Sequence, residues 1–157
     1  MSGKKSHIHS MILVPVVMIF SIVACSPGSC FEETNALVKS TFYSDTSGLM
    51  ASPDSLSIYG GANDTTLIYN RSQKVERALL PLDASETECS FVVEINGVTD
   101  TITFTYNSYP HLISKECGYT YYYTIEDPLF TGNIIDKITV TKNTVTTLAE
   151  ENIRIYY

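Results

Sequence analysis

The segment CSFVVEINGVTDTITFTYN, residues 89–107, constrains the fold more than any other part of the chain. Two runs of alternating apolar and polar residues flank Asn96 and Gly97. Asn-Gly favours a type I′ turn, because both residues tolerate a positive φ, so the segment predicts an antiparallel hairpin. A two-residue loop also sets the register. The predicted cross-strand pairs are Ile95 with Val98, Val93 with Asp100, Phe91 with Ile102, and Cys89 with Phe104.

One face of this hairpin is apolar and the other is polar. The apolar face collects Cys89, Phe91, Val93, Ile95, Val98, Ile102, Phe104 and Tyr106. The polar face carries Glu94, Thr99, Thr101, Thr103 and Thr105, with Val92 as the exception. Such a pattern predicts that one face packs on a core while the other meets water. Asp100 falls on the apolar face but near the hairpin end, where we expect its carboxylate to reach solvent.

Short strand-like runs continue on both sides of the hairpin, with turn signals between them and no convincing helix after Cys30. They are 37–43, 56–59, 65–69, 75–82, 119–125, 134–141 and 152–157. Eight or nine short strands predict one all-β domain over residues 31–157. We expect a single antiparallel β-sandwich, Ig-like or a similar Greek key, with a small β-barrel as the alternative.

The first 24 residues have the layout of a signal peptide. Lys4 and Lys5 precede the apolar run Met11 to Ala24, which is shorter than the ~20 residues that a membrane-spanning helix needs. Ile22, Val23 and Ala24 before Cys25 resemble the lipobox of bacterial lipoproteins. We therefore expect removal of residues 1–24, acylation of Cys25, and a short tether over 25–30. An ordinary secretory signal is the alternative.

Several stretches together resemble a family of uncharacterised Bacteroidetes-type lipoproteins, classed as a domain of unknown function. They are CSPGSCFEETNALVKSTFY, DSLSIYG, EINGVTDTITFTYNSYPHLISKECGYTYYYTI and EENIRIYY. The resemblance implies an envelope location and a lipid anchor, but no activity. In such bacteria, surface-exposed lipoproteins often carry acids directly after the acylated cysteine. Ser26 to Ser29 follow here instead, which favours outer-membrane attachment with the domain facing the periplasm.

Three cysteines remain once Cys25 is acylated, and the compartment beyond the inner membrane is oxidising. Cys89 lies on the predicted apolar face, where a cysteine typically packs as a small hydrophobe. Cys30 and Cys117 precede strands in connecting segments, so we favour a disulfide between them. Closing 86 intervening residues would stabilise the fold by about 4 kcal/mol in the chain-entropy model. Pairing through Cys89 and three reduced thiols stay open as alternatives.

Charge and composition exclude several function classes. Without Lys4 and Lys5, eight basic residues face seventeen acidic ones, about −9 in total. An acidic chain without a basic stripe argues against nucleic acid as a partner. His111 is the only histidine beyond the signal; no nucleophile motif surrounds it, and we expect it in a loop.

The acids Asp83, Glu86 and Glu88, or Glu126 and Asp127, lack the spacing of an EF-hand, so we expect no metal site and no cofactor. We predict no enzyme, but an interaction or structural module whose partners include envelope proteins or glycan.

The run CGYTYYYTI offers a candidate ligand-binding surface. Strand alternation places Tyr119, Tyr121 and Tyr123 on one face and Tyr122 on the other. Tyrosine rings suit sugars, because an apolar face adjoins a polar edge. Tyrosine is also a favoured strand residue that packs its ring while its hydroxyl reaches water. The chain contains no tryptophan, the usual stacking residue of sugar-binding modules, and this favours the structural interpretation.

Overall fold

The computed structural model describes residues 30–60 and 66–157. The chain divides into two units, Met1–Phe31 and Glu32–Tyr157, and the second contains all the described strands. The signal peptide over 1–24 and the acylated Cys25 lie outside the described residues, so both stay predictions. In the part of the chain that the structure describes, no helix is long and apolar enough to cross a membrane.

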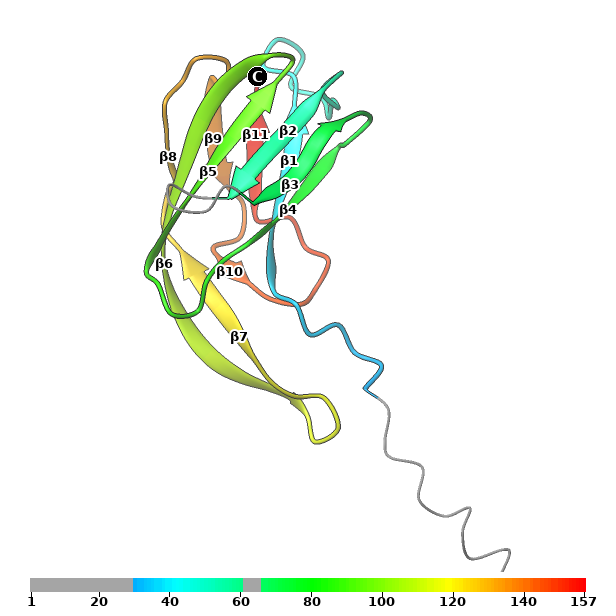
Figure 1. Ribbon diagram of the computed structural model, residues 1–157, viewed down its shortest axis with the longest axis vertical. Coiled ribbons are helices and arrows are strands. Elements are labelled where there is room, and N and C mark those ends of the chain that lie inside the picture. Colours follow the sequence, from blue (N-terminus) through cyan, green and yellow to red (C-terminus); the bar gives the residue numbers. More distant parts are fainter. Residues whose placement is uncertain (1–29, 61–65) are drawn as a thin grey trace, which may run out of the picture. The chain divides into compact units, whose positions relative to one another are not determined.

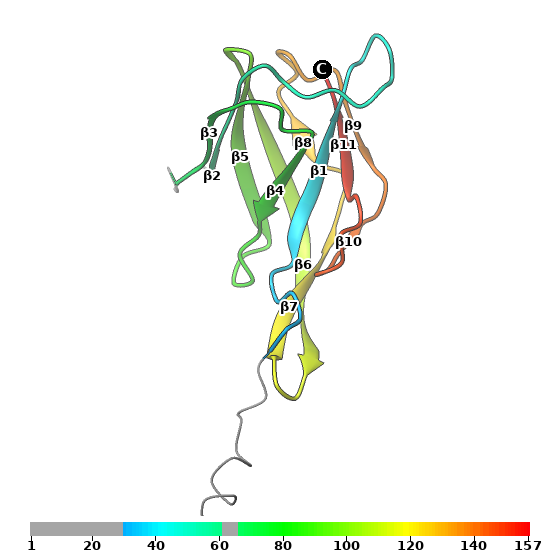
Figure 2. The ribbon, with the colours of Figure 1, turned by 90° about the vertical axis from the view of Figure 1, so that its right-hand side faces the viewer.

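The second unit is an all-β sandwich of two sheets, as predicted (Figures 1 and 2). The smaller sheet has the order β4-β1-β11-β9, and the larger has β10-β7-β6-β5-β2-β3, with β8 on β6. The strands are β1 (Leu37–Tyr43), β2 (Leu56–Gly60), β3 (Leu67–Ser72), β4 (Arg77–Pro81), β5 (Glu88–Ile95), β6 (Val98–Ser114), β7 (Gly118–Ile125), β8 (Leu129–Phe130), β9 (Lys137–Val140), β10 (Thr144–Val145) and β11 (Ile153–Tyr156). The two-residue strands β8 and β10 were not predicted.

The first and last strands depart from the antiparallel pattern expected of the whole domain. β1 and β11 pair in parallel, with Ser40 opposite Ile153 and Phe42 opposite Ile155. No hairpin joins these strands, because the chain between them builds the rest of both sheets. The direction of β11 is therefore not set by a turn from β1.

The β5–β6 hairpin has the predicted register from Ile95 opposite Val98 to Cys89 opposite Phe104. The turn residues Asn96 and Gly97 have φ values of 52° and 85°, which a type I′ turn requires. Most of the predicted apolar face is buried in the core with side chains of β1, β4 and β11. Val98 is exposed, because it directly follows the turn.

The prediction that Asp100 reaches solvent is wrong. Asp100 is only 1% exposed, and its carboxylate accepts hydrogen bonds from the backbone N–H groups of Asn133, Ile134 and Ile135 and from the Thr131 hydroxyl. Burial alone would raise the pKa of Asp100, but these hydrogen bonds hold the pKa below its usual value. The carboxylate therefore fastens the segment 131–135 to β6.

β6 is much longer than expected, since it continues through Pro110 to Ser114. Proline removes a ladder donor and is normally confined to strand edges. In the described part of the chain, β5 pairs with β6 only as far as Thr105, so the distal part of β6 has β7 as its strand neighbour. Pro110 therefore lies in a part of β6 that has a free edge, where a strand tolerates proline.

Candidate functional site

The tyrosines of β7 share a face as predicted, but only two of them are accessible. The exposed fraction of the side chains falls from 74% at Tyr119 to 48% at Tyr121 and 6% at Tyr123. The Tyr123 hydroxyl donates to the Leu82 carbonyl at 3.0 Å, and its ring meets that of Tyr106 edge-on, with centroids 5.6 Å apart. Tyr123 is thus a core residue and is unavailable for stacking on a ligand.

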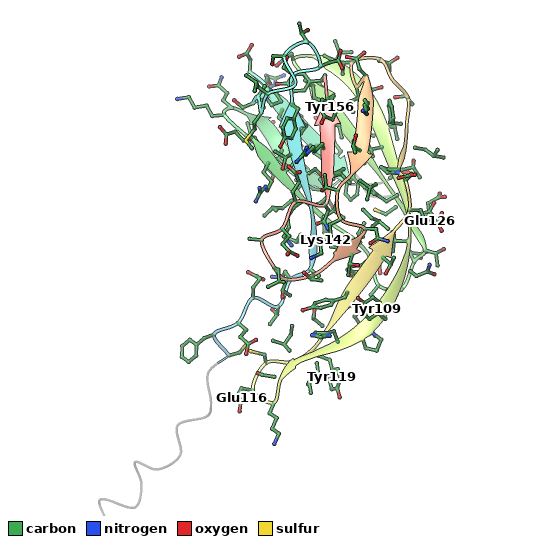
Figure 3. All side chains as sticks on the ribbon, turned by 180° about the vertical axis from the view of Figure 1, so that it is seen from behind. Tyr109, Glu116, Tyr119, Glu126, Lys142 and Tyr156 are labelled. Carbon is green, nitrogen blue, oxygen red and sulfur yellow. The ribbon has the colours of Figure 1, made fainter. Side chains whose placement is uncertain are left out.

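The distal half of the β6–β7 hairpin projects beyond the other strands (Figure 1). Across the strand pair, Pro110 lies opposite Tyr121 and Leu112 lies opposite Tyr119. All four are exposed, and together they form what we call the hairpin apolar face. In Figure 3, Tyr119 lies near Glu116 at the far end of the hairpin, away from Tyr156 of β11. Along this face of β7, the tyrosines therefore continue from the buried Tyr123 to the exposed Tyr121 and Tyr119.

The opposite face of the hairpin holds a small aromatic cluster. The ring of His111 stacks on that of Tyr122, with centroids 4.1 Å apart and planes 15° from parallel. Tyr109 meets the same Tyr122 ring edge-on at 6.2 Å. The expectation that His111 lies in a loop is wrong: it is a strand residue of β6, opposite Thr120. Its ring helps to hold the two strands of the hairpin together.

The base of the hairpin is fixed to the sandwich by the loop after β4. Consecutive carbonyl groups of Leu82, Asp83 and Ala84 accept hydrogen bonds from the hydroxyls of Tyr123, Tyr106 and Ser108, at 3.0, 2.9 and 2.9 Å. Burial raises the pKa of Tyr106 to about 12. Its hydroxyl therefore stays protonated at any ordinary pH and remains a hydrogen-bond donor. These hydrogen bonds therefore hold the base of the hairpin against the loop 82–84.

The segment that precedes β1 reaches the same hairpin. The Thr120 hydroxyl donates to the Thr34 carbonyl at 2.6 Å. At the hairpin turn, the backbone N–H of Cys117 donates to the Ser114 hydroxyl at 3.1 Å. Cys30 and Cys117 are each disulfide-bonded, which makes them a disulfide-capable pair. Cys89 is half-buried on β5 opposite Phe104, on the core-facing side predicted for it.

Asp83, one of the acidic residues considered for metal binding, has a structural role. Within residues 30–60 and 66–157, no group of three or more His, Cys, Asp or Glu residues is placed to hold a metal ion. Asp83 instead accepts hydrogen bonds from the hydroxyl and backbone N–H of Ser85, at 2.6 and 2.8 Å. These hydrogen bonds lower the pKa of Asp83. The carboxylate therefore stabilises the turn that carries the three carbonyl acceptors at the hairpin base.

The model of one protein family matches residues 55–157, about two thirds of the chain. The chain belongs to the family of unknown function DUF6452. The part matched to DUF6452 includes the whole β6–β7 hairpin and omits β1. No curated protein and no solved structure matches the chain. The hairpin apolar face thus lies within the DUF6452 region, and the family itself assigns it no role.

Sequence reasoning missed Pro110 and Leu112 as members of this surface. The alternation that begins in the hairpin continues through Tyr106, Ser108, Pro110 and Leu112 on one face of β6. The predicted hairpin segment ends at Asn107, three residues before Pro110. The signal that could have extended it was the matching alternation in the residues of β7, which supply the partner for a strand of this length.

Proposed function

We propose that this DUF6452 protein is a lipid-anchored protein of the bacterial cell envelope whose β-sandwich is a non-enzymatic interaction or structural module. The observation that carries the proposal is Cys25, which follows Ile22, Val23 and Ala24 at the end of the apolar run. Acyl chains on one cysteine supply membrane affinity of about 0.8 kcal/mol per buried CH₂, so two or three chains anchor stably. The proposed site is the outer membrane, with the domain in the periplasm.

The composition of the candidate site supports a binding role over a catalytic one. The exposed side chains of the hairpin apolar face are tyrosine, leucine and proline, which bind by packing and by hydroxyl hydrogen bonds. The neighbouring His111 ring is stacked on Tyr122. An acid–base catalyst instead needs its ring nitrogens aimed at a reacting group. The surface is therefore suited to holding a partner in place.

The anchor is tested by Cys25→Ala. We expect this variant to lose the acyl mass and to move from the membrane fraction to the soluble fraction, because its thiol is the proposed acylation site. Intact mass and fractionation of cells provide the measurement. Ser29→Ala, in the same tether, is the matched control and should remain acylated and membrane-bound. Continued membrane attachment of Cys25→Ala would refute the assignment.

A second candidate function is glycan binding through Tyr119 and Tyr121, which the exposure of these two rings favours. On this proposal, the protein binds a sugar on a glycan array, and Tyr119→Ala abolishes the binding while Leu129→Ala leaves it intact. Leu129 matches Tyr119 in exposure but lies on β8. Absence of binding at millimolar sugar would exclude this function.

A further inference from the structure

We propose that the hairpin apolar face is a second membrane contact: Pro110, Leu112, Tyr119 and Tyr121 rest on the lipid–water interface of the membrane that holds Cys25. The proposal rests on the lipid anchor proposed above. The contact adds to the anchor in two ways. It assigns lipid as the binding partner of the hairpin apolar face, and it gives the domain an orientation on the membrane. The hairpin then points at the membrane and the rest of the sandwich points away from it.

The length of the tether brings the hairpin to the membrane. Thr34 follows Cys25 by nine positions, and an extended chain spans at most about 3.6 Å per residue, so Thr34 lies within about 32 Å of Cys25. The Thr34 carbonyl accepts a hydrogen bond from the hydroxyl of Thr120, which lies between Tyr119 and Tyr121 along β7 with its side chain on the opposite face of the hairpin. The predicted bridge from Cys30 to Cys117 would shorten the tether to five residues, or about 18 Å.

The far part of the sandwich is held at a greater distance. Leu129 on β8 lies opposite Thr103 of β6, which is nine residues along β6 from Leu112. At about 3.3 Å per strand residue, these two positions on β6 are about 30 Å apart. The tether of about 18 Å, which the predicted bridge from Cys30 to Cys117 would give, is shorter than this separation and so favours contact of the hairpin with the bilayer over contact of β8.

The chemistry of the surface fits the interface of a bilayer. Tyrosine is enriched at membrane–water interfaces, where its ring meets acyl chains and its hydroxyl meets headgroups and water. Leu112 and Pro110 add apolar area beside the two rings. The only polar side-chain atoms of the face are the two tyrosine hydroxyls, whereas a sugar site needs several convergent polar groups. The face is thus better matched to lipid than to glycan.

The charges around the hairpin favour zwitterionic over anionic lipid. Lys115 and Glu116 at the turn cancel one another. Glu32 and Glu33 precede Thr34 on the segment that reaches the hairpin, and they add negative charge on that side. An anionic surface would repel these carboxylates, while a phosphatidylcholine or phosphatidylethanolamine surface would not. Vesicles of phosphatidylcholine are therefore the appropriate probe.

The absence of tryptophan from the chain makes the test direct. Tyr119→Trp and Leu129→Trp each introduce a single fluorophore at positions of matched exposure, 74% and 72%. The acylated full chain is reconstituted in phosphatidylcholine vesicles with and without brominated acyl chains. We expect Tyr119→Trp to lose most of its emission to bromine quenching and to shift to the blue. Leu129→Trp should show neither effect.

A second change tests whether the apolar character of the face is required. Leu112→Asp, made in the Tyr119→Trp background, places a carboxylate directly opposite the fluorophore. Because Leu112 is exposed, the fold should tolerate the change. Quenching should fall to the level of Leu129→Trp, while the protein stays on the vesicles through its acyl chains. Unchanged quenching in this variant would overturn the proposal.

The outcomes separate this inference from the anchor on which it rests. Intact mass is measured first, and an unacylated chain would refute the anchor. An acylated, vesicle-bound chain in which Tyr119→Trp and Leu129→Trp are equally unquenched would overturn the membrane contact and leave the anchor standing. Emission of Tyr119→Trp that responds to a soluble glycan but not to brominated lipid would also overturn it, in favour of glycan binding.

Discussion

Replacing Asp100 with alanine is expected to lower the free energy of unfolding by about 4 kcal/mol, a large effect for a single residue. The carboxylate is buried and accepts from the backbone N–H groups of Asn133, Ile134 and Ile135 at 2.7, 2.8 and 2.9 Å. Alanine would leave these donors without their acceptor; the N–H of Ile135 is buried and those of Asn133 and Ile134 are partly buried, and an unsatisfied buried donor costs about 1–3 kcal/mol. Urea unfolding followed by circular dichroism provides the measurement.

Two control variants identify the cause. Asp100→Asn keeps the size but replaces one acceptor oxygen with a donor that faces backbone N–H groups, so its loss should be substantial and smaller than that of alanine. Thr99→Ala, at the exposed neighbouring position, should stay within about 0.5 kcal/mol of the natural protein. An Asp100→Ala protein that unfolds at the same urea concentration as the natural protein would contradict the assigned role.

The stabilisation by Asp100 also depends on pH in a defined direction. The pKa of this carboxyl in the folded protein lies below its unfolded value of about 3.9. Its contribution is therefore fully present above the unfolded pKa and is lost as the pH falls through the folded pKa. The difference in unfolding free energy between the natural protein and Asp100→Asn should consequently be constant near neutral pH and shrink in acid.

The contrast between the turn and Asp100 shows what the sequence could reveal about the fold. Asn96 and Gly97 define the turn and hence the register of β5 on β6, because a two-residue loop allows only one pairing. The partners of Asp100 lie more than thirty residues away along the chain, in 131–135. No local pattern indicates that this segment crosses the end of the hairpin, so the buried carboxylate could not be predicted.

The tyrosine strand shows the same limit for the candidate site. Alternation correctly places Tyr119, Tyr121 and Tyr123 on one face, because side chains of a strand alternate strictly. Where the core ends along that face depends on the loop 82–84, whose carbonyl groups receive Tyr106, Ser108 and Tyr123. That loop belongs to another part of the chain, so the candidate surface included three tyrosines where the structure exposes two.

Removing the disulfide predicted between Cys30 and Cys117 is expected to cost about 4 kcal/mol of unfolding free energy in the chain-entropy model. Both residues are disulfide-bonded in the structure, and Cys117 lies in the turn of the β6–β7 hairpin. The bridge would close a loop with 86 intervening residues and so lower the conformational entropy of the unfolded chain. Urea unfolding without a reducing agent, so that the disulfide stays intact in the natural protein, provides the measurement.

Three variants test the pairing itself. If Cys30 and Cys117 bond to one another, Cys30→Ser, Cys117→Ser and the double variant should all lose the same stability, since each removes the same bond. Mass mapping without reduction should recover a peptide that links the two residues. Additive losses, or a linked peptide that contains Cys89, would contradict the pairing. Either result would also remove the shorter of the two tethers between Cys25 and the hairpin. The hydrogen bond from Thr120 to Thr34 would then be the remaining link that keeps the hairpin near the membrane.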